Sequence, residues 1–195
     1  MVNDILNSIN KELNKLIGLY EIDNSIDYST ILIKLCKDEL LKLIDEETSV
    51  ILNNVGDVDI KRGDLCYNVD IKIQDINKTY SFPNLTSIKK VKDTISNFNN
   101  HIIYVFVEYE IGILGKIRID KITVRNIEDL DWSYLYIQNI GRGQLQIKNI
   151  TREEFKFNNE ITRTEWLREL KTKSIEYYNN LILKITEYKS DWEDG

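Results

Sequence analysis

Three residues of this chain, Asp57, Asp70 and Lys72, have the types and spacing of a catalytic set. Asp70 and Lys72 are two residues apart on a predicted strand, so the two-residue period places them on the same face. Asp57 lies on the preceding predicted strand and can bring a second carboxylate to the same point. Two carboxylates and one amine can hold a divalent cation next to a phosphodiester, which indicates a metal-dependent nuclease.

The proposed chemistry gives each side chain a role. Mg²⁺ prefers oxygen ligands and keeps several waters, so Asp57, Asp70 and substrate phosphate oxygens would suffice as ligands. Asp59, two residues further along the same strand face, is the alternative to Asp57. Lys72 would orient the attacking water or offset negative charge on the phosphate oxygens. The sequence leaves open whether a glutamate from the second predicted helix region also joins the site, the candidates being Glu39, Glu46 and Glu47.

The triplet Asp70-Ile71-Lys72 is short, and similar triplets recur elsewhere in the chain. In most proteins such a triplet is a solvated face of a strand or helix. Three features favour this one: it ends an apolar strand, it follows an acid-rich strand, and an irregular loop follows it. The competing triplet Asp59-Ile60-Lys61 lies just before a turn, where charged residues are expected as solubilising groups.

The hydrophobic pattern predicts one mixed β-sheet flanked by helices, an α/β (α+β) fold in a single domain over residues 1–195. Expected helices cover 2–18, Asp27 or Ser29 to Ile44, 85–97 and 162–188. Expected strands cover 49–61, 65–74, 102–107, 111–124, 134–137 and 144–148, with Arg62-Gly63-Asp64 as a turn. We assign residues 1–45 to dimerisation, 49–124 to the catalytic sheet, 133–150 to the recognition loop region and 162–190 to a C-terminal helix.

The net charge of −6 counts against nucleic-acid binding, which usually draws on a basic surface. The charge is uneven, however, because acids dominate residues 1–60 and bases outnumber acids from Arg142 to Lys173. No apolar run is long enough to span a bilayer, and the N-terminus lacks the pattern of a signal peptide. We therefore expect no membrane association. Cys36 and Cys66 are isolated, so we expect neither a zinc site nor a disulfide framework, and a reducing cytoplasm is the default.

The order and spacing of several motifs resemble the HincII-like type II restriction endonucleases, in the EcoRV-like branch of the PD-(D/E)xK nuclease superfamily. The resemblance covers residues 50–190 and rests on Asp70-Ile71-Lys72, Pro83-Asn84, Ser87, Leu135-Tyr136-Ile137, Gln144-Leu145-Gln146-Ile147 and Thr162-Arg163-Thr164-Glu165-Trp166. It favours Asp57 over Asp59 as the first acid. It implies a restriction-endonuclease-like fold in a bacterial or archaeal homodimer. That dimer would cut a short, palindromic double-stranded DNA site with Mg²⁺ and no nucleotide cofactor.

The resemblance also implies DNA-binding residues in two loops. Asn84 matches a base-contacting position, and Ser81 falls where the family places a side chain that wedges into the base stack. Its neighbours Tyr80 and Phe82 could stack on a base instead. The glycine-rich loop Gly141-Arg142-Gly143-Gln144 adds Arg142 and Gln144, which can pair with guanine and adenine in the major groove.

Structural explanations compete with several of these assignments. Pro83-Asn84 is also an ordinary segment before a helix, and Gly141-Arg142-Gly143 is an ordinary turn. Trp166 is expected to anchor the last helix, and His101 to be structural rather than catalytic. The tyrosines of the last helix are expected to pack, these being Tyr177, Tyr178 and Tyr188.

Two further functions remain open. The first is a structure-specific or repair nuclease on the same fold. The second is a non-catalytic DNA-binding or assembly protein, which the overall acidity favours.

Overall fold

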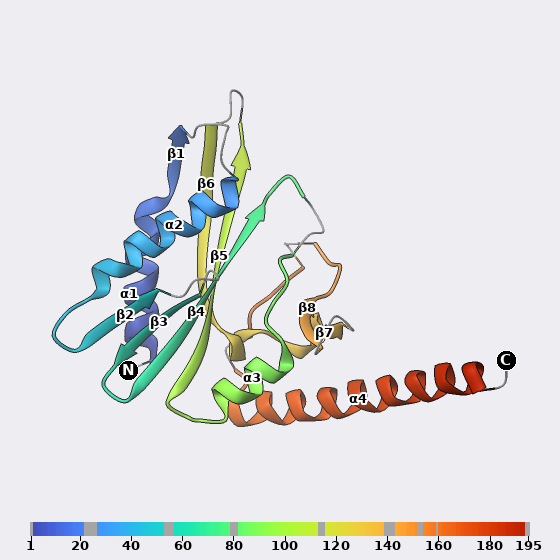
Figure 1. Ribbon diagram of the computed structural model, residues 1–195. Helices are drawn as coiled ribbons and strands as arrows, with labels where there is room; N and C mark the ends of the chain where they lie inside the picture. Colours follow the sequence, from blue (N-terminus) through green and yellow to red (C-terminus); the bar gives the residue numbers. More distant parts are fainter. Residues whose placement is uncertain are drawn as a thin grey trace.

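A twisted six-stranded sheet forms the centre of this computed structural model (Figure 1). The structure describes residues 2–21, 27–52, 57–78, 82–112, 116–138, 143–151, 154–158 and 160–193, without the side chains of Val2, Asp57, Asp191 and Glu193. The strands of the sheet are β1 (Gly18–Glu21), β2 (Thr48–Leu52), β3 (Asp57–Arg62), β4 (Leu65–Asp75), β5 (Asn100–Ile111) and β6 (Lys116–Asn126). A separate two-stranded sheet joins β7 (Leu135–Gln138) to β8 (Gln144–Ile147). The described α-helices are α1 (Val2–Leu13), α2 (Tyr28–Leu40), α3 (Ile88–Ile95) and α4 (Arg163–Glu193).

The sheet has the strand order β1-β6-β5-β4-β3-β2 and mixes both pairing directions. The β4–β5 pair is parallel and the other neighbouring pairs are antiparallel. A parallel pair needs a crossover, and α3 lies in the chain between β4 and β5. The β3–β4 hairpin turns through Gly63, whose φ of +56° is readily adopted by glycine. This mixed sheet with flanking helices confirms the predicted fold class.

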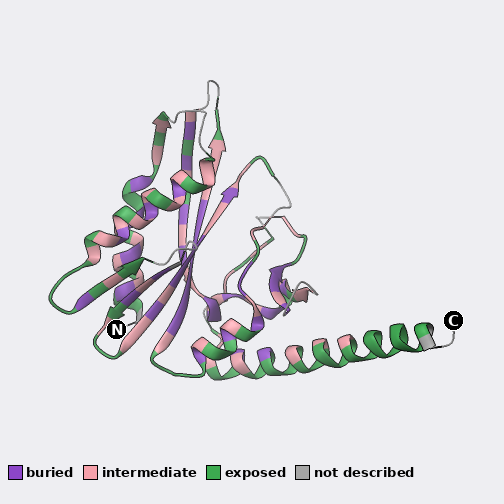
Figure 2. Ribbon diagram, viewed as in Figure 1, coloured by how far each residue is buried: buried purple, intermediate pink, exposed green. Residues whose placement is uncertain are grey.

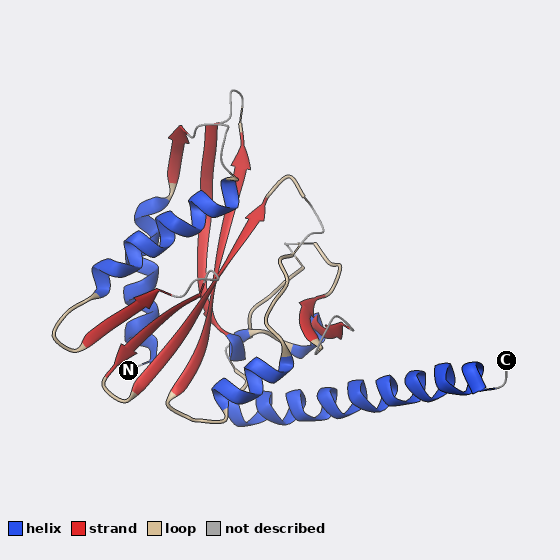
Figure 3. Cartoon of the chain, in the orientation of Figure 1, coloured by secondary structure: helices blue, strands red, loops and turns tan. Residues whose placement is uncertain are grey.

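Helices α1 and α2 cover one face of the sheet (Figures 1 and 3). Their apolar positions recur at helical spacing, so each helix presents one stripe to the strands. Buried residues of this face are Ile5, Ile9, Leu13, Leu32, Cys36 and Leu40 from the helices, and Val58, Ile60, Val69, Ile71, Ile103 and Val105 from the strands. We call this the helix-covered face.

The opposite face of the sheet is covered by α3, β7–β8 and the beginning of α4 (Figure 1). Strand β5 contributes Ile102, Tyr104 and Phe106 to a second core cluster there. Trp166 of α4 is fully buried in the same cluster, and its ring centroid lies 5.1 Å from that of Trp132. The predicted anchoring role of Trp166 is therefore confirmed. Beyond this anchor α4 leaves the body of the protein and becomes exposed (Figure 2).

Several predicted element boundaries differ from the structure. The first helix ends at Leu13, and after a 3₁₀ turn the chain bends at Gly18 into β1, a strand that the sequence pattern did not predict. The predicted strand 49–61 forms two strands, β2 and β3. Ile111 ends β5 instead of starting the next strand.

The ends of two helices are explained by their capping residues. Helix α3 begins at Ile88 rather than residue 85, because the Ser87 side chain caps it. Helix α4 opens with the predicted capping box of Thr162 and Glu165 and continues to Glu193.

None of the described helices combines the length and apolar character needed to cross a membrane.

Candidate active site

Asp70 and Lys72 lie side by side on β4 and form an ion pair, with Lys72 Nζ 2.9 Å from Asp70 Oδ2. Alternation along the strand turns Val69 and Ile71 toward the helix-covered face, so Asp70 and Lys72 lie on the opposite face. The Asp70 and Lys72 side chains are 11% and 16% exposed, so a small part of each is open to solvent. The structure therefore places Asp70 and Lys72 next to each other, as the sequence predicted.

The register of the hairpin places Asp57 directly opposite Asp70. Residues paired in this way share one face of a sheet. Asp59, the alternative first acid, is opposite Asn68 instead, and its Oδ1 accepts a hydrogen bond of 2.7 Å from the Asn68 amide. The backbone thus pairs Asp57, rather than Asp59, with Asp70.

Tyr104 is a neighbour of the acid–lysine pair that the sequence analysis did not identify. It is opposite Asp70 on β5, and Lys72 Nζ lies 5.9 Å from the centroid of its ring. Its hydroxyl accepts a hydrogen bond of 3.2 Å from the backbone amide of Thr86. Tyr104 thus connects the base of the site to the segment that carries Asn84. The sequence signal for this residue was a tyrosine hydroxyl within an otherwise apolar predicted strand, residues 102–107.

The glutamates left open by the sequence lie away from the acid–lysine pair. Glu39 is on α2, over the helix-covered face, and pairs with Lys42. Glu47 is 3.6 Å from Arg62, at the turn end of the hairpin, whereas Asp57 begins the same strand. Glu46 precedes Glu47 in the same connection.

The donor set at this point fits a hard divalent cation. Mg²⁺ needs only one or two protein carboxylates when water and substrate oxygens complete its coordination. The Asp70 carboxylate and the paired position of Asp57 meet that requirement. Within the described residues no cluster of three or more His, Cys, Asp or Glu side chains could hold a metal. The described residues therefore do not form a metal site made of protein ligands alone.

Two segments with predicted DNA-binding residues run next to each other, although about 60 residues separate them in the chain. Leu85 N donates to Leu145 O at 3.2 Å, and Leu145 N donates to Thr86 O at 3.1 Å. The Gln144 amide donates to the carbonyl of Leu85 at 2.5 Å. The Asn84 side chain accepts a 2.8 Å hydrogen bond from the amide of Gln146. The structure therefore brings Asn84 and Gln144 together.

The remaining predicted DNA-binding residues are distributed differently. Phe82 is half-buried, and its ring centroid lies 5.2 Å from that of Phe155. With Gln74 and Phe106 it lines a small cavity of about 60 Å³ on the same side of the sheet as Lys72. Tyr80, Ser81 and Arg142 lie outside the described residues.

His101 is separate from the catalytic candidates, as the sequence predicted. Its ring stacks on Tyr67 with centroids 5.2 Å apart, and its Nδ1 is 3.4 Å from a guanidinium nitrogen of Arg163. Burial, together with the positive charge of Arg163, lowers the pKa of His101 to about 4. A neutral, stacked imidazole has a structural role here.

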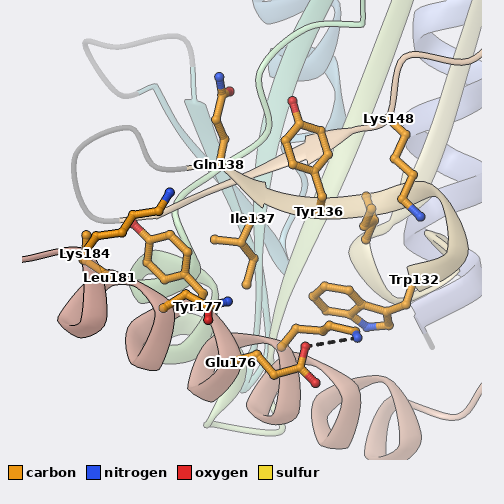
Figure 4. A pocket seen from close by; sticks show the side chains of 12 residues that line it. Trp132, Tyr136, Ile137, Gln138, Lys148, Glu176, Tyr177, Leu181 and Lys184 are labelled. Atoms are coloured by element: carbon orange, nitrogen blue, oxygen red, sulfur yellow. Dashed lines mark hydrogen bonds and ion pairs between the residues drawn. The ribbon is translucent and has the colours of Figure 1, made fainter. Parts of the chain in front are cut away.

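A second, larger pocket of about 600 Å³ lies between β7 and α4 (Figure 4). Tyr136 and Lys148 line one side, and Tyr177 and Lys184 on α4 line the other. Lys148 Nζ donates to the carbonyl of Ser133 at 2.5 Å. None of the predicted catalytic residues lines this pocket.

Comparisons with known proteins find similarity among solved structures. No protein-family model matches the chain, and no curated protein matches it in sequence. Among solved structures, the chain is similar to one described as NlaIV restriction endonuclease, with a TM-score of 0.46 and 10% identity. The alignment covers 91% of this chain and 89% of that chain.

Proposed function

We propose that this protein is a magnesium-dependent endonuclease that hydrolyses phosphodiester bonds of double-stranded DNA. The observation that carries the proposal is the 2.9 Å pair of Asp70 and Lys72, on one face of the sheet and directly opposite Asp57. This arrangement supports phosphoryl chemistry because it gathers acidic oxygen donors and one ammonium group at a single point.

The residues divide the chemistry between them. Asp57 and Asp70 would hold Mg²⁺, which when bound would polarise the scissile phosphate and acidify a coordinated water. Lys72, held by Asp70 and lying over Tyr104, would orient the attacking water and offset the negative charge that develops on the phosphate. In-line attack of that water would release the products with no covalent enzyme intermediate.

Site-specific cleavage by a type II restriction endonuclease is the finer proposal. Asn84 and Gln144 lie on adjoining segments, so both could reach bases in one stretch of groove. Arg142, two residues before Gln144 in the sequence, would add a contact to guanine. A palindromic target would match a homodimer, whose two-fold axis would place one site on each strand. The HincII-like pattern of motifs supports this version.

Cleavage assays with paired lysine variants test the proposal. Purified protein is incubated with phage DNA and Mg²⁺, and discrete fragments that EDTA abolishes are expected. Lys72→Ala should lower cleavage at least about 1000-fold, because it removes charge stabilisation from the transition state. Lys61→Ala is the matched control, since this exposed lysine belongs to the other Asp-x-Lys of the hairpin. Intact DNA on AT-rich and GC-rich substrates alike would reject the nuclease, and a smear would favour a nuclease without sequence specificity.

A second pair of variants separates the two candidate first acids. Asp57→Asn should remove cleavage, because this position is opposite Asp70. Asp59→Asn should retain it, because the Asp59 carboxylate bonds Asn68 instead. The reverse result would move the metal site two residues along β3 and would contradict the proposed ligand set.

A further inference from the structure

Between Ile175 and Trp192, α4 carries a row of large apolar side chains that are exposed to solvent. This part of the helix is coloured mostly as exposed in Figure 2. Exposure reaches 51% for Ile175, 60% for Ile182, 57% for Ile185 and 88% for Trp192. Tyr178, in the same row, is 43% exposed, and its ring centroid lies 5.2 Å from that of Tyr177. The prediction that the tyrosines of this helix pack is confirmed for Tyr177, which packs against the second core cluster, and is wrong for Tyr188, which is 65% exposed. Exposed rows of this kind mark interaction surfaces.

The spacing within this row is that of a coiled coil. Ile175, Tyr178, Ile182, Ile185 and Trp192 fall on the two apolar positions of a heptad, with Lys189 at the remaining position of the row. We call these six residues the α4 seam. The seam is distinct from the stripe that anchors α4 to the body through Trp166 and Leu170. It spans about 26 Å at 1.5 Å per residue.

The first two seam residues also line an apolar groove between α3 and α4. The groove has a volume of about 640 Å³. Its apolar lining consists of Ile88, Leu167, Leu170, Ile175 and Tyr178. The seam and the groove therefore form one continuous apolar surface.

We propose that this surface pairs with the same surface of a second copy of the chain, with the two α4 helices antiparallel. A two-fold axis between residues 183 and 184 would match Ile182 with Ile185 of the other copy. The same axis would match Tyr178 with Lys189, and Ile175 with Trp192. Because Ile175 lines the groove, the register that pairs the seams also delivers the exposed Trp192 ring to the apolar groove.

The charges at the two ends of the seam favour this antiparallel arrangement. The groove is bordered by three lysines and one aspartate, which are Lys89, Lys92, Lys171 and Asp93. The last turns of α4 carry Glu187, Asp191 and Glu193 around Lys189. An antiparallel pair would bring the acidic end of each helix to the basic groove of the other copy. A parallel pair would place like charges together instead.

This inference deepens the homodimer of the proposed function by naming its surface. It differs from the predicted dimerisation segment, residues 1–45. The apolar stripes of that segment, including Ile9, Leu32 and Leu40, are already buried against the sheet. Exposed apolar side chains do remain at the ends of its elements, at Leu19 and Ile44.

Self-association can be measured without DNA or metal, so the inference and the nuclease activity are tested independently. Sedimentation of the full chain should give a dimer. Ile182→Glu should raise the dimer dissociation constant at least about 100-fold, since each dimer loses two apolar contacts and gains charges at its centre. Leu183→Glu is the matched control, because Leu183 is 61% exposed but lies off the seam. Far-UV circular dichroism would confirm that both variants retain their helix content.

Tryptophan fluorescence gives a second readout on the same samples. Trp132 and Trp166 are buried in the core, whereas Trp192 is 88% exposed. Emission should therefore shift to the blue as the protein concentration rises, and Trp192→Phe should remove that shift. Dissociation should become easier at high salt, because the end charges are screened.

Three outcomes would overturn the inference. They are a monomer at about 100 μM, equal effects of Ile182→Glu and Leu183→Glu, and dissociation by Leu19→Glu or Ile44→Glu without an effect of Ile182→Glu. A monomer that still cuts DNA would remove this inference and leave the nuclease proposal standing. A dimer that depends on the α4 seam but does not cut DNA would support this inference and reject the nuclease proposal.

Discussion

The two faces of strand β4 have opposite properties although their residues alternate along one chain. Val69 and Ile71 are at most 5% exposed and pack beneath α1 and α2, in a layer of aliphatic side chains. Asp70 and Lys72, between and beside them, form an ion pair on the other face. Strand β4 therefore uses one face for burial and carries polar groups on the other.

The aliphatic face of β4 holds the charged residues of the other face in fixed positions. Burial on the helix-covered face fixes the backbone of β4, and the strand period then fixes the directions of Asp70 and Lys72. A slip of one residue would exchange the two faces, so the aliphatic side chains specify the register of the acids. Substitutions on the two faces should consequently affect different measurements.

The largest expected effect is on the polar face. Asp70→Asn should lower DNA cleavage at least about 1000-fold, equivalent to about 4 kcal/mol in the activation free energy, because it removes a metal-binding charge. It should also abolish the heat of Mn²⁺ binding in calorimetry. Its effect on stability should be small, since the lost ion pair is offset by relief of repulsion between acids at opposite positions. Retained cleavage by Asp70→Asn would contradict the assignment of catalysis to the polar face of β4.

The neighbouring residue on the helix-covered face should behave in the opposite way. Val69→Ala leaves a cavity at a fully buried position and should lower the free energy of unfolding by about 2 kcal/mol. Cleavage below the unfolding transition should stay close to that of the unaltered protein. Urea titration followed by circular dichroism measures the first quantity. A Val69→Ala protein that is stable but inactive would show that the two faces are not separable.

The sequence predicted the parts of the site that depend on local period. The alternation around Asp70 and Lys72 and the turn at Gly63 were sufficient to anticipate the hairpin and its shared face. The capping box of α4 was equally local, because its two members are only three residues apart.

The contacts that depend on tertiary packing could not be read from the sequence. Nothing local shows that Tyr104 bonds the backbone at Thr86, or that β1 completes the edge of the sheet beside β6. Arg163 is a similar case. Its guanidinium donates to the carbonyls of Ile95 and Asn100, which joins the start of α4 to the α3–β5 connection. The partner of Tyr104 is 18 positions away and those of Arg163 are more than 60 positions away, and periodicity carries no information about either.

A smaller effect is expected from His101, at the end of the helix-covered face, on the pH dependence of the unfolding free energy. Because its pKa is about 4 in the folded chain and about 6.5 when unfolded, His101 stays neutral in the fold while the unfolded chain takes up a proton. Its stabilising contribution is thus complete above pH 6.5 and is lost as the pH falls toward 4. After allowance for solvent screening this loss amounts to about 1 to 2 kcal/mol. The measurement is the free energy of unfolding at intervals across that range.

The control for this titration is His101→Phe, which keeps an aromatic ring next to Tyr67 but cannot bind a proton. The unfolding free energy of the unaltered protein should rise relative to that of His101→Phe as the pH rises from 4.5 to 6.5. A constant difference would mean that the imidazole is charged in the fold, contrary to its burial beside Arg163.

The smallest expected effect is at the cap of α3, on the side of the sheet opposite α1 and α2. The Ser87 side chain accepts a hydrogen bond of 3.2 Å from the backbone amide of Lys90, so Ser87→Ala should destabilise the protein by about 1 kcal/mol. Ser87→Asp, which can still accept this bond, should recover most of the loss. Equal losses in both variants, measured by thermal unfolding, would show that Ser87 matters for packing instead.

Because Ser87 bridges to Gln144, a weaker cap should also raise the KM for DNA while leaving kcat unchanged. That combination would assign the segment around Ser87 to substrate binding and leave hydrolysis to the acids and lysine of the β3–β4 hairpin.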